Sequence, residues 1–272
     1  MIASCSIRRS KIDVRAMPFD GVTPGGTVYP ENRPSFERFR AVLFDIDGTL
    51  LRTGGAGVRA FRRTAALWGH PGAMDQVSFH GRTDTSLARQ FLSGVGRPDT
   101  AVECERFLAV YAFLLEEELS RGGGELCPAI PALLNLLESL PEPPLIGLLT
   151  GNVRMGAVLK LAAHGLEHRF LLGAFGDDHE SRNQLAVVAR QRVSKCLGTP
   201  VPGSEIVVIG DTPADIECAR AIQAPCLAVA TGAFSVQDLR LHQPDWVVSS
   251  FEELLPSPDA NWEGAPNASG VP

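Results

Sequence analysis

The sequence predicts an α/β protein, in which a Rossmann-like parallel sheet core carries an inserted all-α cap. Short apolar runs alternate with helical patterns along most of the chain, which is typical of a parallel sheet with helices on both faces. One stretch, 56–121, contains helical patterns only, and this interruption predicts the insert. Polar residues directly follow three of the apolar runs, at the edge where open α/β sheets bind ligands.

The expected strands and helices follow from these patterns. Apolar runs that predict buried strands cover 41–44, 145–149, 206–209 and 226–230, and weaker strand patterns cover 172–175 and 246–248. Helical patterns between the strands cover 153–163, 182–197 and 213–222. Within the insert, the longest helical pattern spans 102–119.

Composition divides the chain into four parts. We expect disordered segments at 1–37 and 256–272, because both are rich in Pro, Gly or polar residues and lack periodicity. An α/β core is expected at 38–53 and 127–255, with the helical cap at 54–126. Glycine runs at both ends of the cap fit either two hinges or ordinary caps and loops.

Overall composition argues against two classes of partner. The chain has 272 residues, a net charge of −6 and 44% hydrophobic residues, so we expect a soluble globular protein. No basic patch is present to bind nucleic acid, and no apolar run approaches the ~20 residues that a membrane span needs. Six scattered cysteines without a CxxC pair indicate free thiols and a cytoplasmic location. The oligomeric state is left open.

Two aspartates follow the first apolar run, in Phe44-Asp45-Ile46-Asp47-Gly48-Thr49. Residues i and i+2 of an extended strand point the same way, so both carboxylates emerge together. Two such anions are unfavourable side by side unless a cation lies between them, and their hard oxygen ligands suit Mg²⁺. Gly48 allows a sharp turn, and Thr49 can donate to a phosphate oxygen.

Two further strand ends carry polar residues. Asp211 ends the run at 206–209, and Asp215 lies in the first turn of the next predicted helix. Thr150, Gly151 and Asn152 follow the run at 145–149, where exposed N–H groups would hold an anion at a helix N-terminus. A plain helix cap explains each pattern alone. Together with Asp45, they predict a metal site beside a phosphate cradle.

The Asp-x-Asp-Gly-Thr and Gly-Asp-Thr-x-x-Asp motifs resemble those of the haloacid dehalogenase (HAD) superfamily, specifically its phosphoglycolate-phosphatase-like branch with a helical cap. The resemblance covers roughly 38–255. It implies a Mg²⁺-dependent phosphatase that hydrolyses a small-molecule phosphate monoester through an aspartyl-phosphate intermediate. This small phosphate ester is the expected partner.

The resemblance also implies roles for individual residues. Asp45 would be the nucleophile, Asp47 the general acid/base, and Thr150 the phosphoryl-binding residue. The implied metal ligands are Asp45, Asp47, Asp211 and Asp215. The cap segment Gly81-Arg82-Thr83-Asp84 is similar to the family's substrate-contacting loop. The implied substrate-binding residues are therefore Gly48, Thr49, Arg82, Gly151 and Asn152.

One departure from the family pattern concerns a lysine. The family has a Lys before the helix that leads to the second acidic motif, and here that place reads Glu180-Ser181-Arg182-Asn183. The chain has only Lys11, Lys160 and Lys195; Lys195 lies too close to the following strand, and Lys160 lies within a helix. We therefore predict that Arg182 takes the catalytic role of this lysine. A solvated surface arginine is the alternative.

Single residues argue for or against other activities of the same fold. A haloacid dehalogenase lacks the second Asp of the pair, so Asp47 argues against it. A phosphonate hydrolase needs a lysine in the cap, and 54–125 contains none. A sugar phosphomutase uses the same residues and stays open. From a different class, a non-catalytic HAD-like binding module also stays open, and the sequence does not name the substrate.

Overall fold

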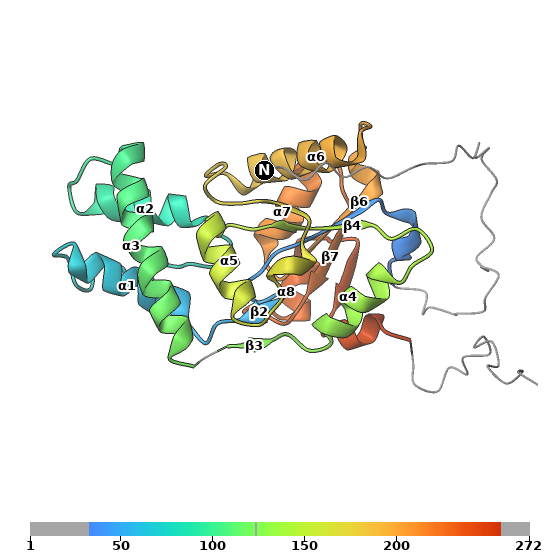
Figure 1. Cartoon of the computed structure of the whole chain (residues 1–272), viewed down its shortest axis with the longest axis horizontal. Helices are drawn as coiled ribbons and strands as arrows, with labels where there is room; N and C mark the ends of the chain where they lie inside the picture. The colour runs from blue at the N-terminus through green and yellow to red at the C-terminus, as the bar shows by residue number, and fades with distance from the viewer. Residues whose placement is uncertain (1–32, 123, 257–272) are drawn as a thin grey trace, which may run out of the picture. The chain divides into compact units, whose positions relative to one another are not determined.

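The computed structural model describes residues 33–122 and 124–256 (Figure 1). The segments predicted to be disordered, 1–37 and 256–272, lie mostly outside this range. Within the first of them, a 3₁₀ helix, η1 (Phe36–Arg38), begins at the buried Phe36. Phe36 packs in the main hydrophobic cluster, so the core begins earlier than residue 38.

Six parallel strands form the main sheet, in the order β5-β4-β1-β6-β7-β8. Their bounds agree with the predicted runs to within one residue: β1 (Ala41–Phe44), β4 (Leu145–Leu149), β5 (Leu172–Ala174), β6 (Ile206–Gly210), β7 (Cys226–Val229) and β8 (Trp246–Val248). The predicted α/β fold is confirmed. In the register, Phe44 at the end of β1 lies opposite Leu148 and Ile209. The three strands that precede the polar motifs therefore end at the same edge of the sheet.

Helices cover both faces of this sheet (Figure 1). Val42 and Phe44 of β1 share one buried cluster with α4 (Ile130–Glu138) and α5 (Arg154–Ala162). Leu43 shares the other cluster with α6 (Arg182–Leu197) and α7 (Pro213–Ala221). The alternation of β1 side chains between two clusters explains why its whole sequence is apolar. A short helix, α8 (Val236–Leu241), precedes β8.

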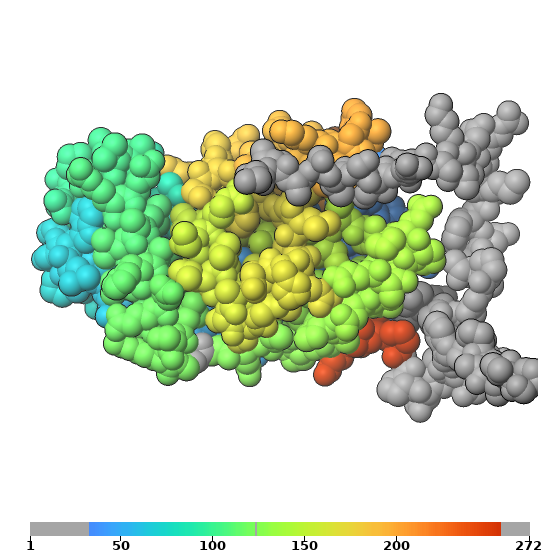
Figure 2. Space-filling view, in the orientation of Figure 1, coloured from blue at the N-terminus to red at the C-terminus, as the bar shows by residue number. Residues whose placement is uncertain are grey.

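The segment that interrupts the strand pattern forms three helices, α1 (Ala56–Leu67), α2 (Asp84–Gly94) and α3 (Ala101–Ser120). Their apolar faces form a third cluster around Phe61, Phe91 and Phe107. Helix α3 lies against α5 of the core, and the green and yellow surfaces of these segments meet (Figure 2). No helix in 33–122 or 124–256 is long and apolar enough to cross a membrane.

The chain enters and leaves this insert through a small antiparallel ribbon. β2 (Leu51–Arg52) pairs with β3 (Glu125–Leu126), so that Leu51 lies opposite Leu126. The sequence analysis did not predict these two strands, because two residues are too few to show periodicity. The ribbon holds the two ends of the insert side by side.

The packing of α3 predicts a large loss of stability for Phe107→Ala. Phe107 is 0% exposed, whereas Phe113 in the same helix is 70% exposed. Removal of a buried Phe side chain leaves a cavity, so the free energy of unfolding should fall by about 3–5 kcal/mol in urea titrations. Phe113→Ala is the matched control and should change it by less than about 0.5 kcal/mol. Equal effects of the two substitutions would contradict this packing.

Candidate active site

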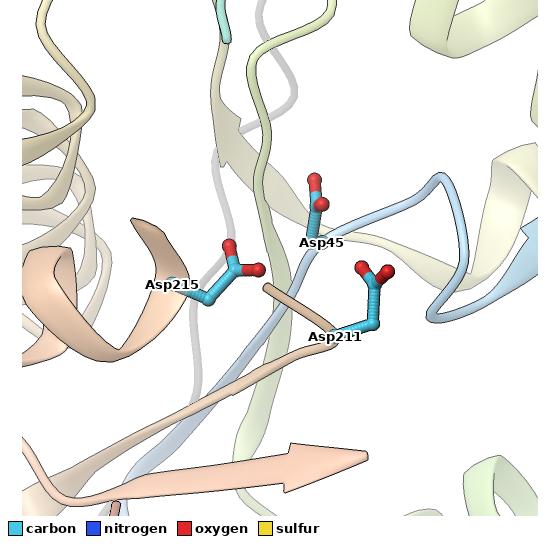
Figure 3. A group of neighbouring side chains, drawn as sticks. All are labelled: Asp45, Asp211 and Asp215. Carbon is cyan, nitrogen blue, oxygen red and sulfur yellow. The ribbon is translucent and has the colours of Figure 1, made fainter. Parts of the chain in front are cut away.

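Three carboxylates meet at the edge where β1 and β6 end (Figure 3). Asp45 directly follows β1, Asp211 directly follows β6, and Asp215 lies in the first turn of α7. One oxygen from each lies within 4.8 Å of the others. All three are buried, so their charges are poorly screened by water.

The three carboxylates differ in how many hydrogen bonds they accept. Asp215 is fully engaged: its Oδ2 accepts bonds from Thr212 N (3.0 Å) and Thr212 Oγ1 (2.7 Å), and its Oδ1 pairs with Arg182. Asp45 Oδ1, in contrast, is buried without a hydrogen-bond partner. A buried unpartnered carboxylate oxygen is costly, so this atom calls for a cation or a reacting group.

The charges of the site fit a divalent cation. Three carboxylates face a single guanidinium, that of Arg182, which leaves two negative charges in excess. Burial, together with Asp215 and Asp47, raises the pKa of Asp45 to about 6 against the opposing Arg182. Burial, together with Asp215 and Asp45, raises the pKa of Asp211 to about 8. A cation such as Mg²⁺ would favour the ionised forms, with Asp45 and Asp211 as ligands and Asp215 behind them.

Two glycines keep space around the Asp211 carboxylate. Gly48 has φ +82°, and a Cβ there would lie 2.4 Å from Asp211 Oδ2. A Cβ on Gly232 would lie 1.7 Å from the same oxygen. Any larger residue at either position would displace the carboxylate. The sequence analysis singled out Gly48 for its turn, but nothing in the local pattern pointed to Gly232.

Thr49 and Thr150 differ in what their hydroxyls do. Thr49 was predicted to donate to a phosphate oxygen, but it is fully buried and donates to Asp211 Oδ1 at 3.3 Å. It therefore holds Asp211 in place. Thr150 lines a cavity at the strand ends together with Gly151 and Asn152, and the role of these residues in binding phosphate stays a prediction. Its Oγ1 accepts bonds from Asn152 N (3.3 Å) and Asn152 Nδ2 (2.9 Å).

The position of Asp47 contradicts the prediction that it shares one cation with Asp45. The sequence argument placed one cation between Asp45 and Asp47, but Asp47 lies outside the carboxylate group formed with Asp211 and Asp215. Its Oδ2 instead accepts bonds from Lys160 Nζ (2.6 Å) and Asn152 Nδ2 (2.7 Å). The two anions are thus balanced separately, Asp47 by a lysine and Asp45 by an arginine.

Lys160 is a site residue that the sequence analysis set aside. It was excluded because it lies within a helix, and it does lie in α5, but its ammonium reaches the cavity. Helix α5 begins shortly after the end of β4, so a long side chain two turns into the helix still reaches the strand ends. The only local signal is a lysine on the buried face of an amphipathic helix.

Arg182 lies where the sequence placed it and points inward. Its side chain is 9% exposed, with Nη2 3.5 Å from Asp45 Oδ2 and a closer ion pair to Asp215. Burial alone would lower the pKa of Arg182, but Asp215 and Asp45 outweigh this effect and raise it, so the side chain stays charged. The alternative of a solvated surface arginine is wrong.

A cavity of about 450 Å³ extends from these residues to the insert. The core contributes Asp45, Asp47, Lys160 and Arg182, among others, and the insert adds apolar and aromatic walls that include Val58, Phe61, Phe79, Leu87 and Tyr111. Arg82 also lines the cavity, but its guanidinium contacts Gln90 and the Ser86 carbonyl oxygen. Its substrate-binding role stays a prediction.

The first turn of α2 is bonded directly to the segment that follows β4 and to Gly176. Asp84 N donates to the Gly151 carbonyl at 2.8 Å, and Asp84 Oδ2 accepts from Val153 N at 2.9 Å. Thr85 Oγ1 donates to the Gly176 carbonyl at 2.7 Å. A Cβ on Gly151 would lie 2.3 Å from the Arg82 carbonyl oxygen, so only glycine allows this approach. The insert therefore contacts the site through backbone as well as side chains.

Known sequences that resemble this chain include a hydrolase family model and two phosphatases. Residues 183–254 match the model of the HAD-hydrolase-like family. The phosphoglycolate phosphatase of Yersinia pestis is 28% identical over 228 residues, which cover 82% of this chain and 94% of that protein. The phosphoglycolate phosphatase of Escherichia coli K12 is 24% identical over 247 residues, which cover 82% and 93%.

Solved structures share the fold at lower identity. CbbY from Rhodobacter sphaeroides in complex with phosphate superposes with a TM-score of 0.63 at 18% identity, covering 79% of this chain and 96% of that one. A predicted phosphoglycolate phosphatase from Haemophilus somnus 129pt gives a TM-score of 0.62 at 18% identity, covering 80% and 96%. At this identity the likeness establishes the fold alone.

The buried Asp84 predicts a change in the pH dependence of stability. Burial raises the pKa of Asp84 to about 7, against the opposing effects of Lys160 and the Val153 N–H. A carboxyl with a higher pKa when folded binds more protons in the folded state, so the free energy of unfolding falls from about pH 4 to about pH 7. In Asp84→Asn the acceptor oxygen for Val153 remains but cannot ionise.

The stability of Asp84→Asn relative to the wild type should therefore rise between about pH 5 and about pH 7.5. Urea titrations of both proteins at the two pH values measure this difference. A difference that stays constant or falls with pH would show that Asp84 is ionised in the folded protein throughout.

Proposed function

We propose that this chain is a haloacid dehalogenase-like hydrolase, and that it is a Mg²⁺-dependent phosphatase acting on a small-molecule phosphate monoester through an aspartyl-phosphate. The family-model match over 183–254 and the similarity to phosphoglycolate phosphatases support this proposal. One observation carries the proposal: Asp45 Oδ1 is buried without a partner at the focus of the acidic group. That oxygen is free to attack phosphorus, while Arg182 lies beside the other oxygen, Oδ2. The names of the relatives support a small phosphate ester as the substrate.

The proposed reaction begins with attack of Asp45 on the phosphoryl group. The new bond joins Asp45 Oδ1 to phosphorus, and the bond from phosphorus to the ester oxygen breaks. Asp47 donates a proton to the departing oxygen and then accepts one from the water that attacks phosphorus. Phosphate leaves, and Asp45 returns to its initial carboxylate form.

Charge balance assigns the supporting roles. A phosphate dianion repels a carboxylate nucleophile, and Mg²⁺ held by Asp45 and Asp211 would supply the neutralising charge. Arg182 offsets the negative charge of Asp45 from the protein side. In this proposal, Thr150 and the backbone N–H groups of Gly151 and Asn152 bind phosphoryl oxygens; all three residues line the cavity just before α5, which supports this assignment.

The proposal includes the division of the chain and its location. In it, 54–126 is a cap that encloses the substrate over a core of 38–53 and 127–255, in keeping with the separate hydrophobic cluster of the three inserted helices. The proposed location is the cytoplasm. The free thiols of Cys104, Cys127, Cys196, Cys218 and Cys226 support a reducing compartment.

The first test is hydrolysis of p-nitrophenyl phosphate with and without Mg²⁺. Asp45→Asn should abolish Mg²⁺-dependent turnover, because an amide cannot form the acyl-phosphate. Asp47→Asn should lower kcat by about 10²–10⁴-fold through loss of proton transfer. Asp75→Asn is the matched control, since this carboxylate is 57% exposed, and it should leave turnover unchanged. Near-normal turnover in Asp45→Asn would refute the covalent mechanism.

Arg182 gives a second test of the charge balance. Arg182→Ala should lower kcat/KM by about 10²-fold or more, the scale seen when a site loses one stabilising group. Arg182→Lys should recover part of this loss, because a single ammonium restores the charge but cannot reach both Asp45 and Asp215 in the same way. Arg190→Ala, in the same helix but away from the cavity, is the control. Wild-type kinetics in Arg182→Ala would remove this residue from the mechanism.

A further inference from the structure

We propose that Lys160 is a positioning residue that fixes the carboxylate of Asp47 for proton transfer, and that the inserted helices hold Lys160 in place. This inference rests on the proposed function, because it assigns a partner to the general acid/base of that reaction. The family resemblance assigned no role to Lys160. The hydrogen bonds of its ammonium support the inference.

The ammonium of Lys160 donates hydrogen bonds to two residues, Asp47 and Asn152. Nζ lies 2.8 Å from Asp47 Oδ1, 2.6 Å from Asp47 Oδ2 and 2.5 Å from Asn152 Oδ1. An ammonium has three donors, so these contacts account for all of them. Asn152 Nδ2 closes the ring with a 2.7 Å bond to Asp47 Oδ2. The Asp47 carboxylate is thus held at both oxygens.

The two partners differ in their freedom to move. The Lys160 side chain is 4% exposed, whereas the Asp47 side chain is 44% exposed and lines the cavity. An exposed ion pair between two mobile side chains fixes little. Here the ammonium is buried, and it would be left as an unpaired buried charge if Asp47 moved away, which is unfavourable. The buried partner therefore sets the position of the exposed one.

The insert encloses the lysine. A Cβ on Gly57 of α1 would lie 3.6 Å from Lys160 Nζ and 3.7 Å from Tyr111 Oη of α3. The Asp84 carboxyl, at the start of α2, lies close enough for Lys160 to oppose the rise in its pKa that burial causes. Helices α1 and α2 thus lie close to this ammonium, and Tyr111 of α3 lies beside Gly57. We therefore infer that the bonds from Lys160 to Asp47 depend on the insert being closed over α5.

The charge of Asp45 is balanced by Arg182, so Lys160 is not needed for that purpose. Arg182 lies beside Asp45 and Asp215, and Lys160 contacts neither of them. The two cations serve different carboxylates. Loss of Lys160 should therefore affect the steps that use Asp47 and spare the attack by Asp45.

The two chemical steps can be separated with p-nitrophenyl phosphate. p-Nitrophenolate is a good leaving group that needs no proton, so its release reports attack by Asp45. Hydrolysis of the aspartyl-phosphate needs Asp47 as a base. For this substrate kcat/KM reports the first step, and kcat includes the second.

In Lys160→Met we expect kcat to fall by about 10–10²-fold, part of the contribution of a general base, with kcat/KM within about threefold of wild type. A rapid burst of about one equivalent of p-nitrophenolate should precede the slow steady state. Lys160→Gln keeps a polar side chain in the buried site and should show the same split. Lys195→Met, at an exposed position in α6, is the matched control and should behave as wild type.

A double-mutant cycle tests whether Lys160 acts through Asp47. In the Asp47→Asn background, Lys160→Met should change kcat by less than about twofold, because the group it positions is already gone. An equal fall of kcat and kcat/KM in Lys160→Met would overturn the proposal and make Lys160 a phosphate-binding or structural residue. Loss of the folded state in both Lys160 variants would overturn it too. Absence of Mg²⁺-dependent hydrolysis in the wild type would instead refute the proposed function.

Discussion

The ion pairs of Arg182 with Asp45 and Asp215 are the interaction on which the site depends. Parallel strands that end in register bring Asp45 and Asp211 together, and α7 adds Asp215. Buried like charges at this spacing repel one another strongly. One buried guanidinium between two of these carboxylates lowers the cost of this arrangement, and it still leaves the excess negative charge that a divalent cation would neutralise.

Separate charge balance gives the two aspartates of the Asp-x-Asp motif different chemistry. Asp45 shares its arginine with Asp215 and keeps one oxygen free of hydrogen bonds, which suits the proposed role of nucleophile. Asp47 faces the cavity, and its bonds to Lys160 at both oxygens would orient it for the proposed proton transfer. Neighbouring positions in the sequence thus lead to two environments, because their side chains meet different elements, α6 for Asp45 and α5 for Asp47.

The sequence predicted most of the sheet and the strand-end residues, because their signals are local. Apolar runs mark β1, β4 and β6, and the motifs lie directly after them. What the sequence analysis missed depends on distant contacts. Lys160 enters the site only because its long side chain extends from α5, and Gly232 matters only because Asp211 lies against it. Helix α4 was not predicted, although its buried residues Ile130, Leu133, Leu134 and Leu137 follow the i, i+3, i+4, i+7 spacing of an amphipathic helix.

Contacts of the insert connect cavity closure with the chemistry of Asp47. The β2–β3 ribbon joins the two ends of the insert, so opening would move both linkers together. Such a motion would break the bonds from Asp84 to Gly151 and Val153 near the phosphate cradle. It would also expose Lys160 to water, where its pairing with Asp47 would weaken. In the proposed mechanism, a closed insert would therefore do two things: it would exclude water from the cavity and keep the carboxylate of Asp47 in position.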